Sequence, residues 1–106
     1  MPRIVSFDEQ RGILRVCGEE DRATCGSRRR ALSTAMQAPC DVIVDLTELR
    51  FADSSLMVDL AVLARRLRMG GRQLRLRGPQ PHVQALIEHM GLHRLPAVAL
   101  DGPLLN

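Results

Sequence analysis

Residues 41–56 read Asp-Val-Ile-Val-Asp-Leu-Thr-Glu-Leu-Arg-Phe-Ala-Asp-Ser-Ser-Leu, and this stretch predicts a strand, a short polar loop and the start of a helix. The apolar core of the strand, Val42-Ile43-Val44, does not alternate with polar residues, which indicates a strand covered on both faces, as in a parallel sheet. The helix that begins near Asp53 carries one apolar stripe at helical spacing, formed by Leu56, Leu60, Leu63, Ala64 and Leu67. A strand that leads into such a helix favours an α/β fold.

The flanking segments continue this alternation of strands and helices. Strands are predicted over residues 3–7, 13–17, 41–46, 73–77 and 95–100, and helices over residues 22–36, 54–69 and 81–90. The order ββαβαβαβ predicts right-handed crossovers and a mixed sheet of four or five strands with about three helices. One α/β domain over residues 1–106, with a tail at 101–106, is therefore expected.

Two further features of the pattern concern packing. Gly70-Gly71 and Gly91 are expected to end the second and third helices, because glycine adopts the left-handed backbone found at helix C-termini. Arg28-Arg29-Arg30 are expected mostly on the outer face of the first helix, opposite Leu32, Ala35 and Met36. The apolar residues at periodic positions form the predicted core: Val42, Val44, Leu46, Leu60, Leu63, Leu67, Leu74, Leu76, Leu86 and Ile87.

The composition excludes several function classes. The 15 Lys+Arg against 12 Asp+Glu leave a formal net charge of only +3, and the two aromatic residues, both Phe, are too few to stack on single-stranded nucleic acid. No signal peptide and no apolar run long enough for a bilayer are visible. Three cysteines, at positions 17, 25 and 40, fit no CxxC pair and indicate free thiols. A cytoplasmic protein that neither binds nucleic acid nor inserts into a membrane is expected.

The candidate site is Asp53-Ser54-Ser55, at the junction of loop and helix. Asp53 is a good N-cap, which places Ser54 at N1 and Ser55 at N2. The first-turn amides have no partner within the helix and the macrodipole favours negative charge there, so a phosphate on Ser54 would meet donors that already point at it. On spacing alone, an ordinary helix cap is the better interpretation of these residues, because such caps are abundant.

Several segments together resemble one known family: 42–49 (Val-Ile-Val-Asp-Leu-Thr-Glu-Leu), 51–55 (Phe-Ala-Asp-Ser-Ser), the Gly-Gly and strand at 70–76, Met-Gly-Leu at 90–92, and Gly-Glu-Glu-Asp at 18–21. The chain resembles the STAS domain of bacterial anti-sigma factor antagonists. In that family the first Ser after this Asp is phosphorylated by a partner anti-sigma factor that is also a kinase. Here that residue is Ser54.

The resemblance implies a single STAS-like domain that acts as a phosphorylation-controlled switch. The unphosphorylated form would sequester an anti-sigma factor, a GHKL-type serine kinase, and so release a sigma factor, with a PP2C-type phosphatase as a further implied partner. Ser54 is the predicted phosphoacceptor. Ser55 is the second choice, because Leu56 stands where the family usually has Gly. The predicted partner-binding residues are Gly18, Glu19, Glu20, Asp21, Asp53, Ser54, Ser55 and Asp59.

Two alternative functions stay open: a STAS accessory subunit of a transporter or regulatory complex that works without phosphorylation, and a small module that binds an anionic ligand at the helix N-terminus. No catalytic activity and no cofactor are expected, since Ser54 has no evident base, metal or phosphate-binding glycine loop around it. His82, His89 and His93 lie around the third helix without clustered Cys or carboxylates, so no metal site is predicted.

Overall fold

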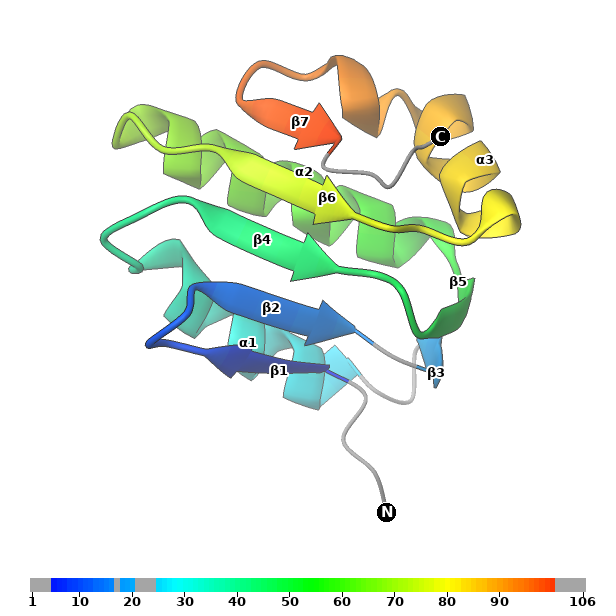
Figure 1. Ribbon diagram of the computed structural model, residues 1–106, viewed down its shortest axis with the longest axis horizontal. Helices are drawn as coiled ribbons and strands as arrows, with labels where there is room; N and C mark the ends of the chain where they lie inside the picture. Colours follow the sequence, from blue (N-terminus) through cyan, green and yellow to red (C-terminus); the bar gives the residue numbers. More distant parts are fainter. Residues whose placement is uncertain (1–4, 17, 21–24, 101–106) are drawn as a thin grey trace.

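The computed structural model describes residues 5–16, 18–20 and 25–100 and shows a sheet with helices packed on it (Figure 1). The strands are β1 (Val5–Asp8), β2 (Ile13–Val16), β3 (Gly18–Glu20), β4 (Val42–Asp45), β5 (Leu49–Ala52), β6 (Leu74–Arg77) and β7 (Val98–Leu100). The helices are α1 (Cys25–Met36), α2 (Ser54–Met69), α3 (Pro81–Met90) and the short 3-10 helix η2 (Leu92–Arg94).

The main sheet has five strands in the order β1-β2-β4-β6-β7. β1 pairs antiparallel with β2, whereas β4, β6 and β7 each run parallel to the preceding strand of the sheet. Parallel neighbours need crossover connections, and the helices supply them. The predicted α/β class and mixed sheet are confirmed. A separate parallel pair, β3 with β5, was not predicted, because strands of three and four residues are too short to show a periodic pattern.

The predicted helices agree with the observed ones where the structure describes them. α2 and α3 cover residues 54–69 and 81–90 as predicted, and α1 ends at Met36; its predicted start at residue 22 lies outside the described residues. Among the described residues, no helix combines the length and the apolar character that crossing a membrane requires.

The end of α3 shows the predicted capping. Gly91 adopts φ 77°, its amide donates to the carbonyl of Glu88, and Leu92 is buried directly after it. The left-handed residue turns the chain into η2 instead of directly into a strand. The last strand consequently begins at Val98, not at residue 95 as predicted.

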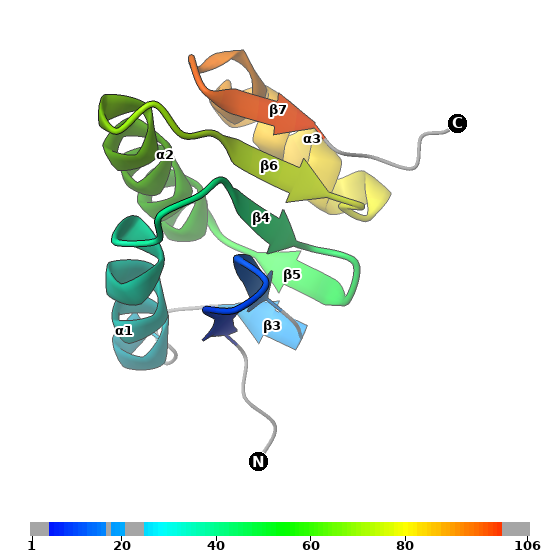
Figure 2. The same cartoon turned by 60° about the vertical axis from the view of Figure 1, so that its left-hand side comes forward.

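The hydrophobic core lies between the main sheet and helices α1 and α2, which pack on the same side of it (Figure 2). Of the ten predicted core residues, nine are fully buried, and only Leu86 is partly exposed at the edge of the core. The apolar stripe of α2 is buried along its whole length. These contacts make α2 the central helix of the domain and fix the position of both of its ends.

The face of the sheet opposite α1 and α2 is polar. Val42 and Val44 of β4 are buried, whereas Ile43 and Asp45 between them are half-buried. The prediction that β4 is covered on both faces is therefore wrong, since a run of three β-branched residues also fits a strand whose middle residue is shielded only by neighbouring strands. On this face the Nε atom of Arg15 lies 3.9 Å from the Oδ2 atom of Asp45, so the two side chains form an ion pair.

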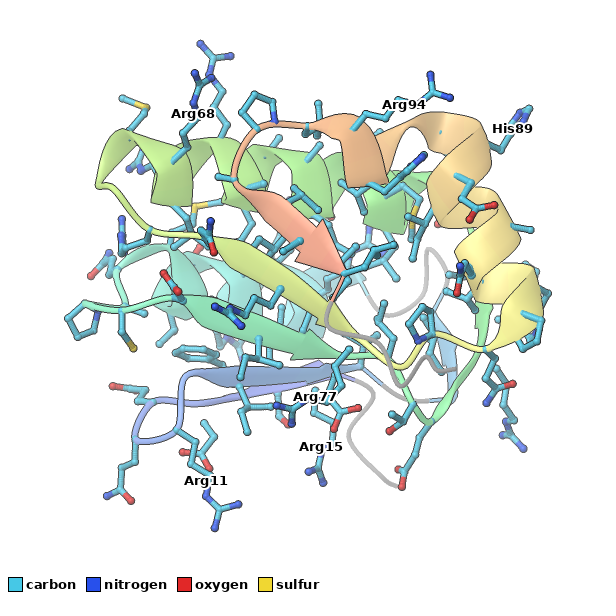
Figure 3. All side chains as sticks on the ribbon, turned by 45° about the horizontal axis from the view of Figure 1, so that its top comes forward. Arg11, Arg15, Arg68, Arg77, His89 and Arg94 are labelled. Carbon is cyan, nitrogen blue, oxygen red and sulfur yellow. The ribbon has the colours of Figure 1, made fainter. Side chains whose placement is uncertain are left out.

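Exposed arginines lie at opposite edges of the described part of the chain. Figure 3 shows Arg11 and Arg15 at the edge of the molecule formed by β1 and β2, and Arg68 and Arg94 at the opposite edge. These four positive charges are therefore well separated.

Candidate functional site

The start of α2 is organised by Asp53, whose extended backbone (φ −100°, ψ 176°) ends the loop after β5. Its Oδ1 atom accepts hydrogen bonds from the amides of Ser55 (3.1 Å) and Leu56 (3.4 Å). These are two of the first-turn donors that the helix itself leaves unsatisfied. The predicted N-cap is confirmed, and Ser54 and Ser55 occupy the first two positions of the helix.

The two serines differ sharply in their surroundings. The hydroxyl of Ser55 donates to Asp53 Oδ1 at 2.6 Å and accepts from Arg28 Nη2 at 3.1 Å, and the residue is half-buried. Ser54 is exposed, and within the described part of the chain its hydroxyl makes no hydrogen bond. The hydroxyl of Ser55 is therefore part of the fold, whereas that of Ser54 is accessible to an external reagent or partner.

Arg28 of α1 contradicts the expectation that Arg28-Arg29-Arg30 face outward. Its side chain is only 3% exposed, and its Nε atom lies 2.8 Å from Asp59 Oδ2 on α2. Arg29 and Arg30 are exposed as predicted. The spacing contained the signal, because position 28 precedes the buried Leu32 by four residues and so shares its helix face. The buried charge is tolerated because the Asp59 carboxylate pairs with it and the Ser55 hydroxyl accepts a hydrogen bond from it.

This network also sets the charge beside Ser54. The hydrogen bond from the Ser55 hydroxyl lowers the pKa of the Asp53 carboxyl most; the two amide hydrogen bonds and the Arg28 charge lower it further, against an opposing effect of burial. Asp53 is therefore ionised at neutral pH. Any phosphate on Ser54 would place a second negative group next to this carboxylate.

The pairing of β3 with β5 brings a second predicted segment to the same place. In the parallel register Glu19 lies opposite Phe51 and Glu20 opposite Ala52, one residue before Asp53. Figures 1 and 2 show this two-stranded ribbon beside the end of the main sheet, where β5 leads into α2. The backbone of residues 18–20 is thus adjacent to the start of α2, and Asp21 lies outside the described residues.

The remaining predicted site residue, Asp59, is held by Arg28 and keeps 33% of its side chain exposed. Its position one turn into α2 makes it part of the link between α1 and α2. Sequence reasoning missed Phe51, which is half-exposed on β5 directly before the site. The sequence feature that could have indicated this residue is the presence of a large apolar side chain in a segment otherwise expected to be a polar loop.

No metal centre is evident in the described ranges, where no group of three or more His, Cys, Asp or Glu side chains is placed to hold an ion. The accessible chemistry of the site is that of one free hydroxyl at a helix N-terminus, flanked by an ionised carboxylate. Such an arrangement can accept a modifying group and present it to a partner.

Comparison with known proteins agrees with this architecture. The family model described as "Mlab, STAS domain" matches residues 4–101. Among solved structures, the chain is similar to the phosphorylated form of the Bacillus cell fate determinant SpoIIAA, with 25% sequence identity and a TM-score of 0.64 over 84% of this chain and 80% of that one. No curated protein sequence matches the chain.

Proposed function

The chain belongs to the STAS domain family, and on that premise we propose that it is an anti-sigma factor antagonist whose binding to its partner is switched off by phosphorylation of Ser54. The observation that carries this proposal is the difference between the two serines. The Ser55 hydroxyl is hydrogen-bonded to Asp53 and Arg28, whereas Ser54 is exposed and its hydroxyl is accessible. The structural relative that has been observed in a phosphorylated form supports the same chemistry.

The switch acts through charge. A phosphoserine carries about −1.5 to −2 charges at neutral pH. At the N-terminus of α2 this charge is tolerated, because the helix dipole favours it by about 0.3–1 kcal/mol. Against a partner surface, the same charge must be desolvated beside the ionised Asp53. A penalty of about 2.8 kcal/mol lowers affinity roughly a hundredfold. Phosphorylation thus changes binding and leaves the fold intact.

The proposed partner is an anti-sigma factor that is also a GHKL-type serine kinase. The kinase binds ATP and Mg²⁺ and transfers the terminal phosphoryl group of ATP to Ser54 Oγ, which releases ADP and the hydroxyl proton. A PP2C-type phosphatase hydrolyses the phosphoserine back to serine and inorganic phosphate. The chain itself acts in the cytoplasm as a binding protein and catalyses no reaction. Its contact surface consists of the first turn of α2 and the neighbouring β3–β5 ribbon, where Phe51 offers apolar area.

The test compares Ser54→Ala, Ser54→Asp and Ser55→Ala for binding to the cognate anti-sigma factor, with thermal stability recorded for each variant. Ser54→Asp is expected to weaken binding far more than Ser54→Ala, while both retain the stability of the unmodified protein. Ser55→Ala removes two hydrogen bonds from the fold and is expected to lower the melting temperature.

Mass spectrometry of protein treated with the kinase completes the experiment. Phosphate on Ser54 supports the proposal, and phosphate found only on Ser55 would move the switch to that residue. If Ser54→Asp binds as tightly as the unmodified protein and no phosphate is found, the switch is refuted. A constitutive role as an accessory subunit of a larger complex would then be the better explanation.

A further inference from the structure

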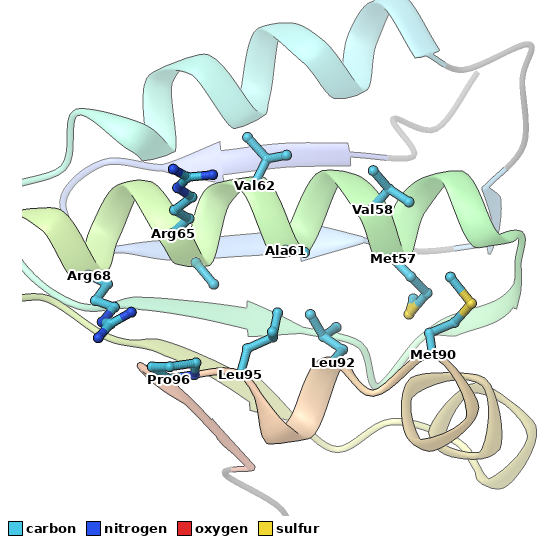
Figure 4. Close-up of a pocket in the computed structure, with 11 residues that line it drawn as sticks. Met57, Val58, Ala61, Val62, Arg65, Arg68, Met90, Leu92, Leu95 and Pro96 are labelled. Carbon is cyan, nitrogen blue, oxygen red and sulfur yellow. The ribbon is translucent and has the colours of Figure 1, made fainter.

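An apolar groove lies between α2 and the segment that follows α3 (Figure 4). Its volume is about 600 Å³. One wall is α2 from Met57 to Arg68, and the other is the segment from Met90 through η2 to Pro96. The groove therefore exists only because the turn at Gly91 lays residues 92–96 alongside α2.

The groove gathers a large share of the exposed apolar surface. The described part of the chain exposes seven large hydrophobic side chains, and four of them line this groove: Val58, Val62, Met90 and Leu95. Val58 and Val62 are 53% and 51% exposed although they lie in the middle of a helix. Single exposed hydrophobic residues are ordinary, but their convergence on one concave surface marks an interaction site.

The charges around the groove have one sign. Arg65 and Arg68 line it, and among the described residues no acidic one does. The single acid of α2, Asp59, is paired with Arg28 on the α1 side of the helix. Figure 4 shows Arg68 next to Pro96 at the end nearer the C-terminus of α2, and Met57 opposite Met90 at the other end. The groove is thus apolar along its length and positive at one end.

From this pattern we infer that the groove binds an amphipathic helix of another protein, with an apolar stripe facing Val58 and Val62 and acidic residues in its first turn. The wall from Val58 to Arg68 is about 15 Å long, which matches three turns of a partner helix. Acidic residues are favoured in the first turn of any helix by its dipole. To reach Arg65 and Arg68, that first turn must lie over the C-terminal end of α2, so the two helices run antiparallel.

Charge complementarity also selects among the possible occupants. A second copy of this chain, docked through the same face, would offer no carboxylate to Arg65 or Arg68 from its described residues, because none of the acids among them lines the groove. An acyl chain would remain largely in water in a groove whose valines are half-exposed. An acidic amphipathic helix covers the apolar wall and neutralises the arginines together. This inference does not depend on phosphorylation of Ser54.

The experiment titrates the full-length protein with a synthetic helical peptide of about 14 residues, roughly 20 Å long, that has leucines on one face and acidic residues in its first turn. The control peptide has lysines in place of the acids. NMR amide shifts report where the peptide binds, and fluorescence anisotropy of a labelled peptide gives the Kd. Shifts confined to α2 and residues 90–96 are expected for the acidic peptide, and weak or no binding is expected for the lysine peptide.

Matched variants separate the groove from general electrostatics. Arg65→Glu is expected to weaken binding of the acidic peptide about tenfold and to restore binding of the lysine peptide. Arg66→Glu makes the same charge change at an exposed residue of the same helix that does not line the groove, and is expected to leave the Kd within about twofold because salt screens it. Val62→Asp should abolish binding. Melting curves verify that each variant folds.

Four results would each overturn the inference. One is equal affinity for the acidic and lysine peptides, and another is an equal loss of binding in Arg65→Glu and Arg66→Glu. A third is a concentration-dependent dimer, without peptide, that Val62→Asp removes, since the groove would then be a self-association surface. The last is tighter binding of dodecanoate than of the peptide at the same amide positions, which would identify an acyl ligand.

Discussion

Replacing Arg28 by Met tests whether the start of α2 depends on a buried charge from α1. The substitution keeps an unbranched side chain that fills most of the space and removes the guanidinium. The contacts that disappear include the ion pair with Asp59 at 2.8 Å and the hydrogen bond to the Ser55 hydroxyl at 3.1 Å. We expect a strongly destabilised protein whose fold is retained.

The magnitude follows from what each partner loses. Removing one member of a buried ion pair costs about 3–5 kcal/mol when the other charge stays buried. Asp59 keeps a third of its side chain exposed and can be rehydrated, which reduces this penalty. Ser55 retains its hydrogen bond to Asp53, so no orphaned hydroxyl is added. A net loss of about 2–3 kcal/mol in the free energy of unfolding is therefore expected, a drop of roughly 10 °C or more in Tm for a domain of this size.

Urea denaturation of a double-mutant cycle measures the effect. The cycle contains Arg28→Met, Asp59→Leu and the double variant, and Arg29→Met serves as the matched control, since Arg29 is the exposed neighbour on the same helix. The double variant should be more stable than the sum of the single losses predicts, by about 1 kcal/mol or more, because it leaves no unpaired charge. If Arg28→Met unfolds at the same urea concentration as Arg29→Met, the buried network does not stabilise the link between α1 and α2.

Two further predictions concern the core and the cap. Leu63→Ala, at a fully buried position of α2, should lower the free energy of unfolding by about 2–5 kcal/mol in the same urea assay, whereas Val62→Ala, at the half-exposed neighbour, should change it by about 0.5 kcal/mol or less. Asp53 has its pKa lowered in the folded state, so its contribution to stability is fully present above the ordinary aspartate pKa of about 3.9 and is lost as the pH falls through the folded-state value. Asp53→Asn can still cap the helix, and it should lose less stability than the unmodified protein as the pH falls below about 4. Equal slopes for the two proteins would show that Asp53 titrates alike in the folded and unfolded states.

The sequence alone determined the features that depend on neighbours within one or two helical turns. The bounds of α2 and α3, the cap at Asp53 and the left-handed end at Gly91 all follow from local spacing and backbone preference. The buried stripe of α2 follows from the helical period. The same local chemistry placed Ser54 and Ser55 correctly at the first two helix positions, and the order of motifs identified the STAS domain family.

Only the tertiary structure decided the features that join distant segments. Arg28 is buried where α1 contacts α2, because Asp59 and Ser55, about thirty residues away, interact with it there. No pattern within α1 predicts these two partners. The same contact holds the Ser55 hydroxyl in hydrogen bonds, whereas Ser54 stays exposed. Sequence spacing cannot predict this difference between two adjacent serines. The β3–β5 ribbon and the groove along α2 likewise arise where separate short segments are brought together. Periodicity predicts which face of an element is apolar. Packing among all the elements determines whether that face is covered, and by which other element.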